Sequence, residues 1–259
     1  MGYLRLRQIC LVASDLASVE NQFADVLGLE ICFRDPGVGK YGLHNALFAM
    51  GGTFLEVVSP IRPETAAGRY IDKRKGDGGY MYIVDCDNLE ARREHFKAEG
   101  VRLVEDLKAT EWGITGEGIH LHPRDTGGCL LSVDRHSPNG ENMQGSYKWA
   151  GPDWQKHDRS QTVARIVGAA IQSPDPADLA TRWSHLLQRP LRKGESGMDI
   201  QLDESFVHFG PLRDDRGEGL RAVHLKVKDR SAIIANADRA GVPHGADYVD
   251  LVGVRFLLV

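Results

Sequence analysis

The feature that most constrains the fold is an internal repeat, because one order of elements recurs four times along the 259 residues. Each unit opens with a short apolar strand, continues through an amphipathic helix and closes with short strand-like runs. A repeat of this length defines the architecture before any single motif does. The four opening strands are expected at residues 9–13, 80–84, 166–171 and 222–227. The pattern predicts an α+β protein of four βαβββ modules; the alternative is a generic α+β protein whose helices share a common pattern.

The first expected helix carries its own start and stop signals. Asp15 precedes it and Gly28 follows it, which are typical N-cap and C-terminal residues. The third unit repeats the arrangement, with Asp175 and Trp183 at the spacing of Asp15 and Phe23. One face of the first helix is apolar and carries Leu16, Val19, Phe23, Val26 and Leu27.

A change of composition divides the chain in two. Residues 136–162 are rich in Pro, Gly, Asn and other polar residues, which favours an interdomain connection. We therefore expect an N-terminal domain over residues 1–135 and a C-terminal domain over residues 163–259. Trp149 and Trp154 indicate that the linker packs onto a domain.

Composition narrows the class of protein. The formal net charge is −4 with evenly spread charges, so neither a nucleic acid nor a membrane is expected as a partner. The apolar run 9–13 is too short for a signal peptide or a membrane span. The cysteines are scattered and expected to be reduced, which favours the cytoplasm; they are Cys10, Cys32, Cys86 and Cys129.

The most specific motif is His122-Pro-Arg-Asp-Thr-Gly-Gly, which leads into Leu130-Leu-Ser-Val133. With Glu56-Val-Val-Ser-Pro60 and Asp87-Asn-Leu89 it makes roughly residues 5–135 resemble the methylmalonyl-CoA epimerases. These enzymes belong to the vicinal-oxygen-chelate superfamily of glyoxalases, bleomycin-resistance proteins and dioxygenases. The resemblance implies two glyoxalase-like domains, each a pair of modules around a cavity, with the C-terminal one degenerate.

The same resemblance implies a divalent metal ion (Zn, Ni, Co, Mn or Fe) in an altered centre. Family members place one ligand on the first and one on the last strand of each module. These places fall on Gln8 and Glu56 in the first module and on Met81 and Ser132 in the second, where the family has His and Glu. A thioether and a neutral hydroxyl are poor ligands for such ions, and a catalytic zinc needs about three protein ligands. The alternative is that Gln8 and Glu56 form a buried hydrogen-bonded pair.

Two histidines offer replacement ligands. His120 and His122 lie two residues apart on an expected strand, so their side chains would project to the same face, beside Ser132. The proposed metal ligands are therefore Gln8, Glu56, His120 and His122. Alternatively, both histidines are structural, with backbone groups as partners.

Epimerase chemistry also needs a positioned base and an electrophile for the enolate oxygen. The family's Glu-Gln-Gly before the third strand reads Lys40-Tyr-Gly42 here, which leaves His44 as the nearest substitute base. Glu56 and His44 are the proposed catalytic residues, although a lone histidine on a strand is often structural.

The C-terminal half does not match the iron site of the ring-cleaving dioxygenases. The corresponding places are Gly168, Ala222 and Leu257, and none of them binds metal. His208 and His224 remain, but two histidines without a carboxylate do not form the facial triad. An extradiol dioxygenase is therefore the least favoured function.

The function implied is that of a glyoxalase-like protein binding a small organic molecule in its N-terminal cavity. It is either a lyase or isomerase of glyoxalase or epimerase type with an altered metal centre, or a metal-free sequestering protein of the bleomycin-resistance type. A small-molecule ligand and a homodimer are expected, and no Gly-rich phosphate loop points to a nucleotide cofactor.

Overall fold

The fold is α+β, as the repeat predicts, in a computed structural model that describes residues 2–194 and 196–259. The N-terminal half contains two complete modules. The first has β1 (Leu4–Val12), α1 (Leu16–Leu27), β2 (Ile31–Phe33), β3 (Leu43–Met50) and β4 (Thr53–Pro60), with the 3-10 helix η1 (Pro36–Tyr41) before β3. The second has β5 (Gly78–Cys86), α3 (Leu89–Ala98), β6 (Leu103–Glu111), β7 (Ile114–Leu121) and β8 (Leu130–Ser137). Helix α2 (Ala66–Arg74) joins the two modules, and the short α4 (Pro123–Thr126) joins β7 to β8.

The C-terminal half repeats the plan in shorter form. The third module has β9 (Val163–Ser173), α5 (Pro176–Leu187), β10 (Leu191–Lys193), β11 (Met198–Leu202) and β12 (Ser205–Pro211). The fourth has β13 (Gly219–Val227), α6 (Arg230–Arg239), β14 (Tyr248–Leu251) and β15 (Val254–Leu258). Only an isolated bridge between His244 and Val249 stands where its third strand was expected. Pro243 cannot donate to a strand ladder, and the flanking Gly241 and Gly245 favour turns, so this segment does not extend into a strand.

The modules pair edge to edge into two sheets. The first sheet has the order β2-β3-β4-β1-β5-β8-β7-β6 and the second the order β10-β11-β12-β9-β13-β15-β14. In each sheet the opening strands of the two modules pair antiparallel, β1 with β5 and β9 with β13. This is the predicted arrangement of four modules in two glyoxalase-like halves.

Helix α1 begins and ends at the residues that the sequence predicts. The Asp15 side chain accepts a hydrogen bond from Ser18 N at the start, and Gly28 ends the helix in the left-handed conformation with a φ of 66°. All five residues of the predicted apolar face are buried.

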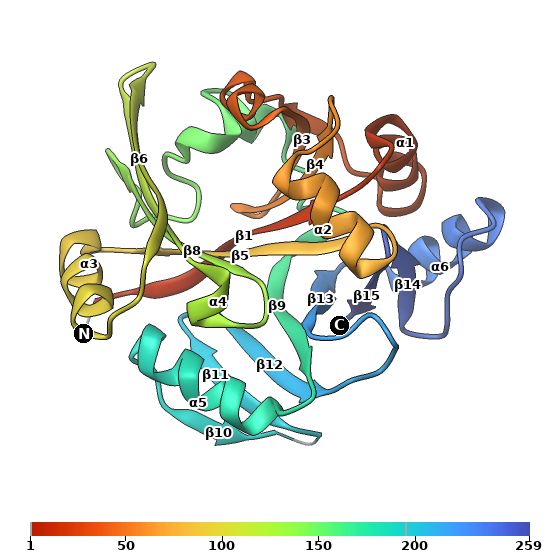
Figure 1. Ribbon diagram of the computed structural model, residues 1–259. Helices are drawn as coiled ribbons and strands as arrows, with labels where there is room; N and C mark the ends of the chain where they lie inside the picture. Colours follow the sequence, from red (N-terminus) through yellow and green to blue (C-terminus); the bar gives the residue numbers. More distant parts are fainter. Residues whose placement is uncertain (1, 195) are drawn as a thin grey trace.

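The two sheets pack against each other through one shared core (Figure 1). Tyr82 of the first sheet contacts Trp183 of α5 edge-on, and Phe23 of α1 contacts Phe256 of β15 in the same way. Each sheet therefore buries one face in the shared core and turns its other face away from it.

The connecting segment, residues 138–162, packs onto the face of the first sheet that is turned away from the shared core. It contains the 3-10 helices η2 (Lys148–Ala150) and η3 (Trp154–His157), and Tyr147 and Trp154 are buried against Phe54. Strand β8 runs to Ser137, so it enters the predicted linker by two residues. The division into domains 1–135 and 163–259 stays a prediction.

None of the helices in the described part of the chain is long and apolar enough to cross a membrane.

Candidate functional site

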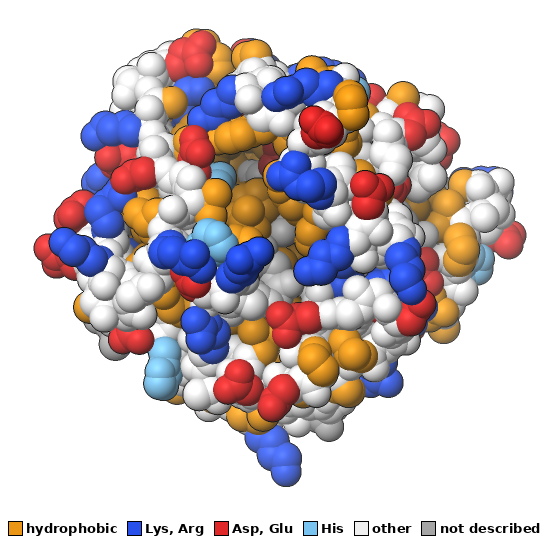
Figure 2. Space-filling view, in the orientation of Figure 1, with side chains coloured by type: hydrophobic (Ala, Val, Ile, Leu, Met, Phe, Trp, Pro, Cys, Tyr) orange, Lys and Arg blue, Asp and Glu red, His pale blue; other side chains and the backbone are white. Residues whose placement is uncertain are grey.

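The first sheet turns one face away from the shared core, and three of the predicted site residues, Gln8, Glu56 and His120, lie on it. Figure 2 shows a hollow with a hydrophobic base and Lys and Arg side chains around it, over β1 and between β6 and α2 of Figure 1. The apolar cluster on this face contains Cys10, Val12, Leu43, Val58, Ala67, Met81 and Ile83. Side chains two residues apart on a strand share a face, which places Gln8, Glu56 and Ser132 beside this cluster.

Glu56 is the centre of a buried hydrogen-bonded chain. Its Oε2 accepts from Gln8 Nε2 at 2.8 Å and its Oε1 from Asn45 Nδ2 at 2.6 Å. Gln8 Oε1 in turn accepts from the Tyr147 hydroxyl at 2.8 Å. Burial raises the pKa of Glu56 above its ordinary value, against the opposing effect of the amide donors. The structure therefore brings Gln8 and Glu56 together and gives the polar atoms of both side chains protein partners.

A second polar chain lies on β8, where the resemblance placed the missing carboxylate ligand. Ser132 Oγ donates to Asp134 Oδ1 at 2.5 Å, and Trp149 Nε1 donates to Asp134 Oδ2 at 2.8 Å. Burial raises the pKa of Asp134 to about 7, although both donors favour the charged form. Ser132 is thus engaged with a neighbouring carboxylate.

His120 is the one proposed histidine on the strand next to this chain. It lies on β7, opposite Ser132 of β8 and Glu105 of β6. Burial lowers the pKa of His120 to about 4, so the ring is neutral at physiological pH. Glu105 also forms an ion pair with Lys40 of η1, with Lys40 Nζ 2.7 Å from Glu105 Oε1. This ion pair links the two modules across this face.

The two other histidines are placed elsewhere. His122 lies beyond the end of β7 as the N-cap of α4, and its Nδ1 accepts from Arg124 N at 3.2 Å. The prediction that His120 and His122 share one strand is therefore wrong. His44 is exposed on β3, and because strand residues alternate it faces the opposite side from Asn45.

The donors on the four strand positions do not fit the divalent ion that the fold family uses. The Glu56 oxygens and Gln8 Oε1 already accept hydrogen bonds, Ser132 donates to Asp134, and Met81 offers only a thioether. Over residues 2–194 and 196–259, no three His, Cys, Asp or Glu side chains are grouped so that they could hold a metal ion. The proposed set Gln8, Glu56, His120 and His122 therefore contains one contacting pair and two separate histidines.

Three residues of these chains escaped the sequence analysis. Asp134 had a usable signal, because it lies two residues after Ser132 on the same strand and so shares its face. Asn45 had a weaker one, as an isolated amide in an apolar strand. Tyr147 had none, since it reaches Gln8 from the connecting segment, 139 residues away in sequence.

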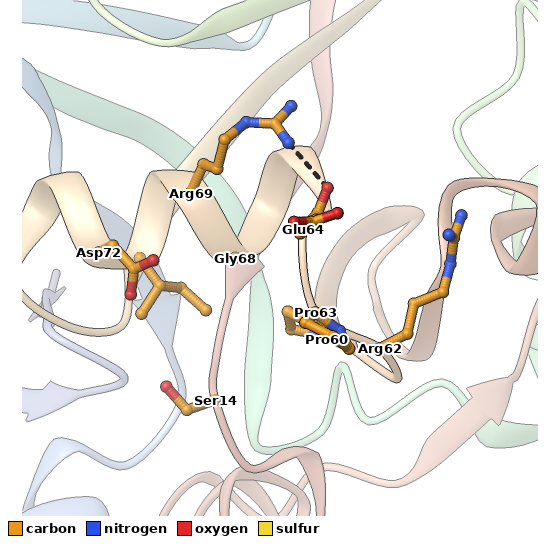
Figure 3. A pocket seen from close by; sticks show the side chains of 9 residues that line it. Ser14, Pro60, Arg62, Pro63, Glu64, Gly68, Arg69 and Asp72 are labelled. Carbon is orange, nitrogen blue, oxygen red and sulfur yellow. Dashed lines mark hydrogen bonds between the residues drawn. The ribbon is translucent and has the colours of Figure 1, made fainter.

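An open pocket of about 680 Å³ lies apart from these residues, beside α2 (Figure 3). Ser14, Pro60, Arg62 and Asp72 are among the residues that line it. Arg69, also in its wall, donates to the Glu64 carbonyl oxygen at 2.7 Å. None of the proposed site residues lines this pocket, so it is not the site that the resemblance implies.

Comparison with known proteins gives this fold and site a family. The model of the glyoxalase-like domain matches residues 9–187, which is more than half of the chain. The chain belongs to this family of the vicinal-oxygen-chelate superfamily.

Individual relatives agree with this assignment. The mitochondrial methylmalonyl-CoA epimerase of Mus musculus is 25% identical over 132 residues, which cover 51% of this chain and 72% of that protein. A hypothetical protein from Staphylococcus aureus has a similar structure, with a TM-score of 0.70, 13% identity and coverage of 99% of this chain and 98% of its own. The Mn(II)-bound glyoxalase from Novosphingobium aromaticivorans gives a TM-score of 0.67 at 15% identity, covering 100% of this chain and 82% of its own. At these identities the two structures show the common fold alone.

Proposed function

We propose that the N-terminal hollow binds a small organic molecule without a metal ion at the four strand positions. The observation that carries this proposal is the pairing of Glu56 with Gln8 and Asn45, which occupies the oxygens that a metal would need. The hollow has an apolar base beside a few polar groups, which is the usual composition of a small-molecule site.

The chemistry of the face indicates how a ligand would be held. Apolar side chains of β3, β4 and β5 would cover its hydrocarbon part. The neutral imidazole of His120 offers one donor and one acceptor to a polar group of the ligand. In this proposal the protein sequesters its ligand. The homodimer, the cytoplasmic location and the lack of nucleic-acid or membrane partners stay predictions from the sequence.

A second candidate function is an isomerase of the epimerase type, with Glu56 as the base. Burial raises the pKa of Glu56, which brings a carboxylate closer to the pKa that suits a general base at neutral pH. The 25% identity to methylmalonyl-CoA epimerase over half of the chain also favours this function. Proton exchange at the α-carbon of methylmalonyl-CoA in D₂O, lost in Glu56→Gln, would support it.

Metal analysis separates the metal-free site from an altered metal centre. Protein purified without chelators and dialysed against Mn²⁺, then against metal-free buffer, is expected to hold no stoichiometric ion. Its metal content should equal that of Glu56→Ala, because the Glu56 oxygens are already hydrogen-bonded. Inductively coupled plasma mass spectrometry on both proteins checks this expectation.

The matched control is Glu94→Ala, which removes an exposed glutamate from α3. One ion per chain in the wild type and in Glu94→Ala, but not in Glu56→Ala, would contradict the proposal. That result would favour a metal-dependent lyase or isomerase instead.

A further inference from the structure

The second sheet also has a face turned away from the shared core, and small residues leave space on it. Across β12, β9 and β13 the register aligns Phe206 with Gly168 and His224. The Phe206 and His224 rings meet edge-on over the glycine, 4.9 Å apart. In the next row, Ala170 lies between His208 and Ala222. The floor between the long side chains of this face is therefore formed by Gly168 and Ala170.

Arg221 projects from an irregular position in β13. The register between β13 and β9 shifts between Leu220 and Ala222, so Arg221 is the extra residue of a β-bulge. Bulges redirect side chains and are common beside functional sites. Arg221 Nε is buried and has no hydrogen-bond partner within residues 2–194 and 196–259.

The surroundings of Arg221 concentrate positive charge. Burial lowers the pKa of Arg221, and the neighbouring Arg213 and Arg255 lower it further by repulsion, against a smaller opposing effect of Asp214. The nearby carboxylates have other partners: Asp250 binds Arg255 through two bonds of 2.9 Å, and Asp214 accepts from Gln172 Nε2 at 2.6 Å. A half-buried guanidinium with cationic neighbours is costly unless an anion joins it.

His208 directs a second nitrogen toward the same place. Its Nδ1 lies 2.7 Å from Asp199 Oδ1, which fixes the ring. Its Nε2 points away from that carboxylate and lies 3.4 Å from the Ser196 hydroxyl oxygen, which is longer than an ordinary hydrogen bond. A Cβ atom on Gly210 would lie 3.0 Å from His208 Nε2 and 3.7 Å from Arg221 Nη2. The two nitrogens therefore lie on the same side of Gly210, which has no side chain to separate them.

From this arrangement we infer that the outer face of the second sheet is a binding site for a small oxyanion, a carboxylate or a phosphate group, held by Arg221 and His208. Arg221 supplies a planar fork of donors that matches such groups, and in its imidazolium form His208 can donate from Nε2 while its Nδ1 donates to Asp199. Phe206 and His224 form an apolar wall for the rest of the ligand. This site is independent of the function proposed for the N-terminal hollow.

Thermal melts of the full chain in phosphate and malonate test the site, with sodium chloride of equal ionic strength as the reference. The wild type is expected to show a saturable rise in Tm of about 2–4 °C with at least one of the two anions. Phosphate alone would assign a phosphate ligand, and malonate alone a carboxylate. Arg221→Met should abolish the rise, and His208→Gln should weaken the apparent affinity several-fold.

The matched control is Arg192→Met, which removes an exposed arginine from β10 at the edge of the same sheet and should respond like the wild type. Equilibrium dialysis with labelled phosphate gives a readout that does not depend on folding stability. A wild type that responds to neither anion beyond sodium chloride would overturn the site. An unchanged response in both Arg221→Met and His208→Gln would also overturn it.

Discussion

Replacing Asp85 with alanine is expected to lower the free energy of unfolding by about 3–5 kcal/mol, because it leaves two buried guanidinium groups without their carboxylate. Asp85 Oδ1 accepts from Arg5 Nε at 2.8 Å, and its Oδ2 lies 3.8 Å from Arg7 Nε. The Arg7 side chain is fully buried and that of Arg5 is only 7% exposed, so water cannot replace the lost partner.

The same change should loosen the connecting segment. Arg5 also donates to the Gly140 and Glu141 carbonyl oxygens, and Arg7 donates to the Met143 carbonyl oxygen at 2.9 Å. Asp85 therefore orients two arginines that hold this segment on the sheet. Faster amide exchange around residues 140–147 is expected in Asp85→Ala.

Urea unfolding followed by circular dichroism measures the effect. Glu20→Ala is the control, because Glu20 pairs with the exposed Arg34 and surface pairs contribute about 0–1 kcal/mol. If Asp85→Ala and Glu20→Ala unfold within error of each other, the buried cluster of Asp85, Arg5 and Arg7 does not stabilise the chain.

Much of the fold could be predicted because its signals are local. Asp15 and Gly28 bound a helix through contacts within one turn, and the apolar face of that helix repeats every 3.6 residues. The spacing of Asp175 and Trp183 predicted the third helix for the same reason, because Asp175 caps α5 and Trp183 lies on its buried face.

The site was less predictable because its partners are distant in sequence. The family resemblance placed Gln8 and Glu56 together, but it could not show that Tyr147 and Asn45 complete their hydrogen bonds. The prediction that His122 shares a strand with His120 was wrong for a local reason. Pro123 has no N–H to donate to a strand ladder and opens α4, so the strand ends before it and His122 becomes the N-cap of that helix.

Asp134 is expected to make stability depend on pH, and Asp134→Asn should remove that dependence. The pKa of Asp134 rises from its ordinary 3.8 to about 7 on folding, so folding takes up a proton. Its contribution to stability is fully present below pH 3.8 and is lost as the pH rises through about 7. A shift of this size corresponds to a difference on the order of 4 kcal/mol between the two ends of the window.

Asparagine fits the position without the charge. Its oxygen can accept from Trp149 Nε1, its amide can donate to Ser132 Oγ, and the Ser132 hydroxyl can donate to the Ile119 carbonyl oxygen, 3.3 Å away. Asp134→Asn should therefore match the wild type near pH 4 and be increasingly more stable than it toward pH 8.

The measurement is the free energy of unfolding of both proteins in urea at intervals from pH 4 to pH 8. His120 acts in the opposite direction, because its pKa falls to about 4 on folding and its contribution is lost as the pH drops. Both proteins contain His120, so its effect cancels in their difference. A difference that stays constant from pH 4 to pH 8 would show that Asp134 keeps its ordinary pKa, and that Ser132 and Trp149 stabilise its charge fully.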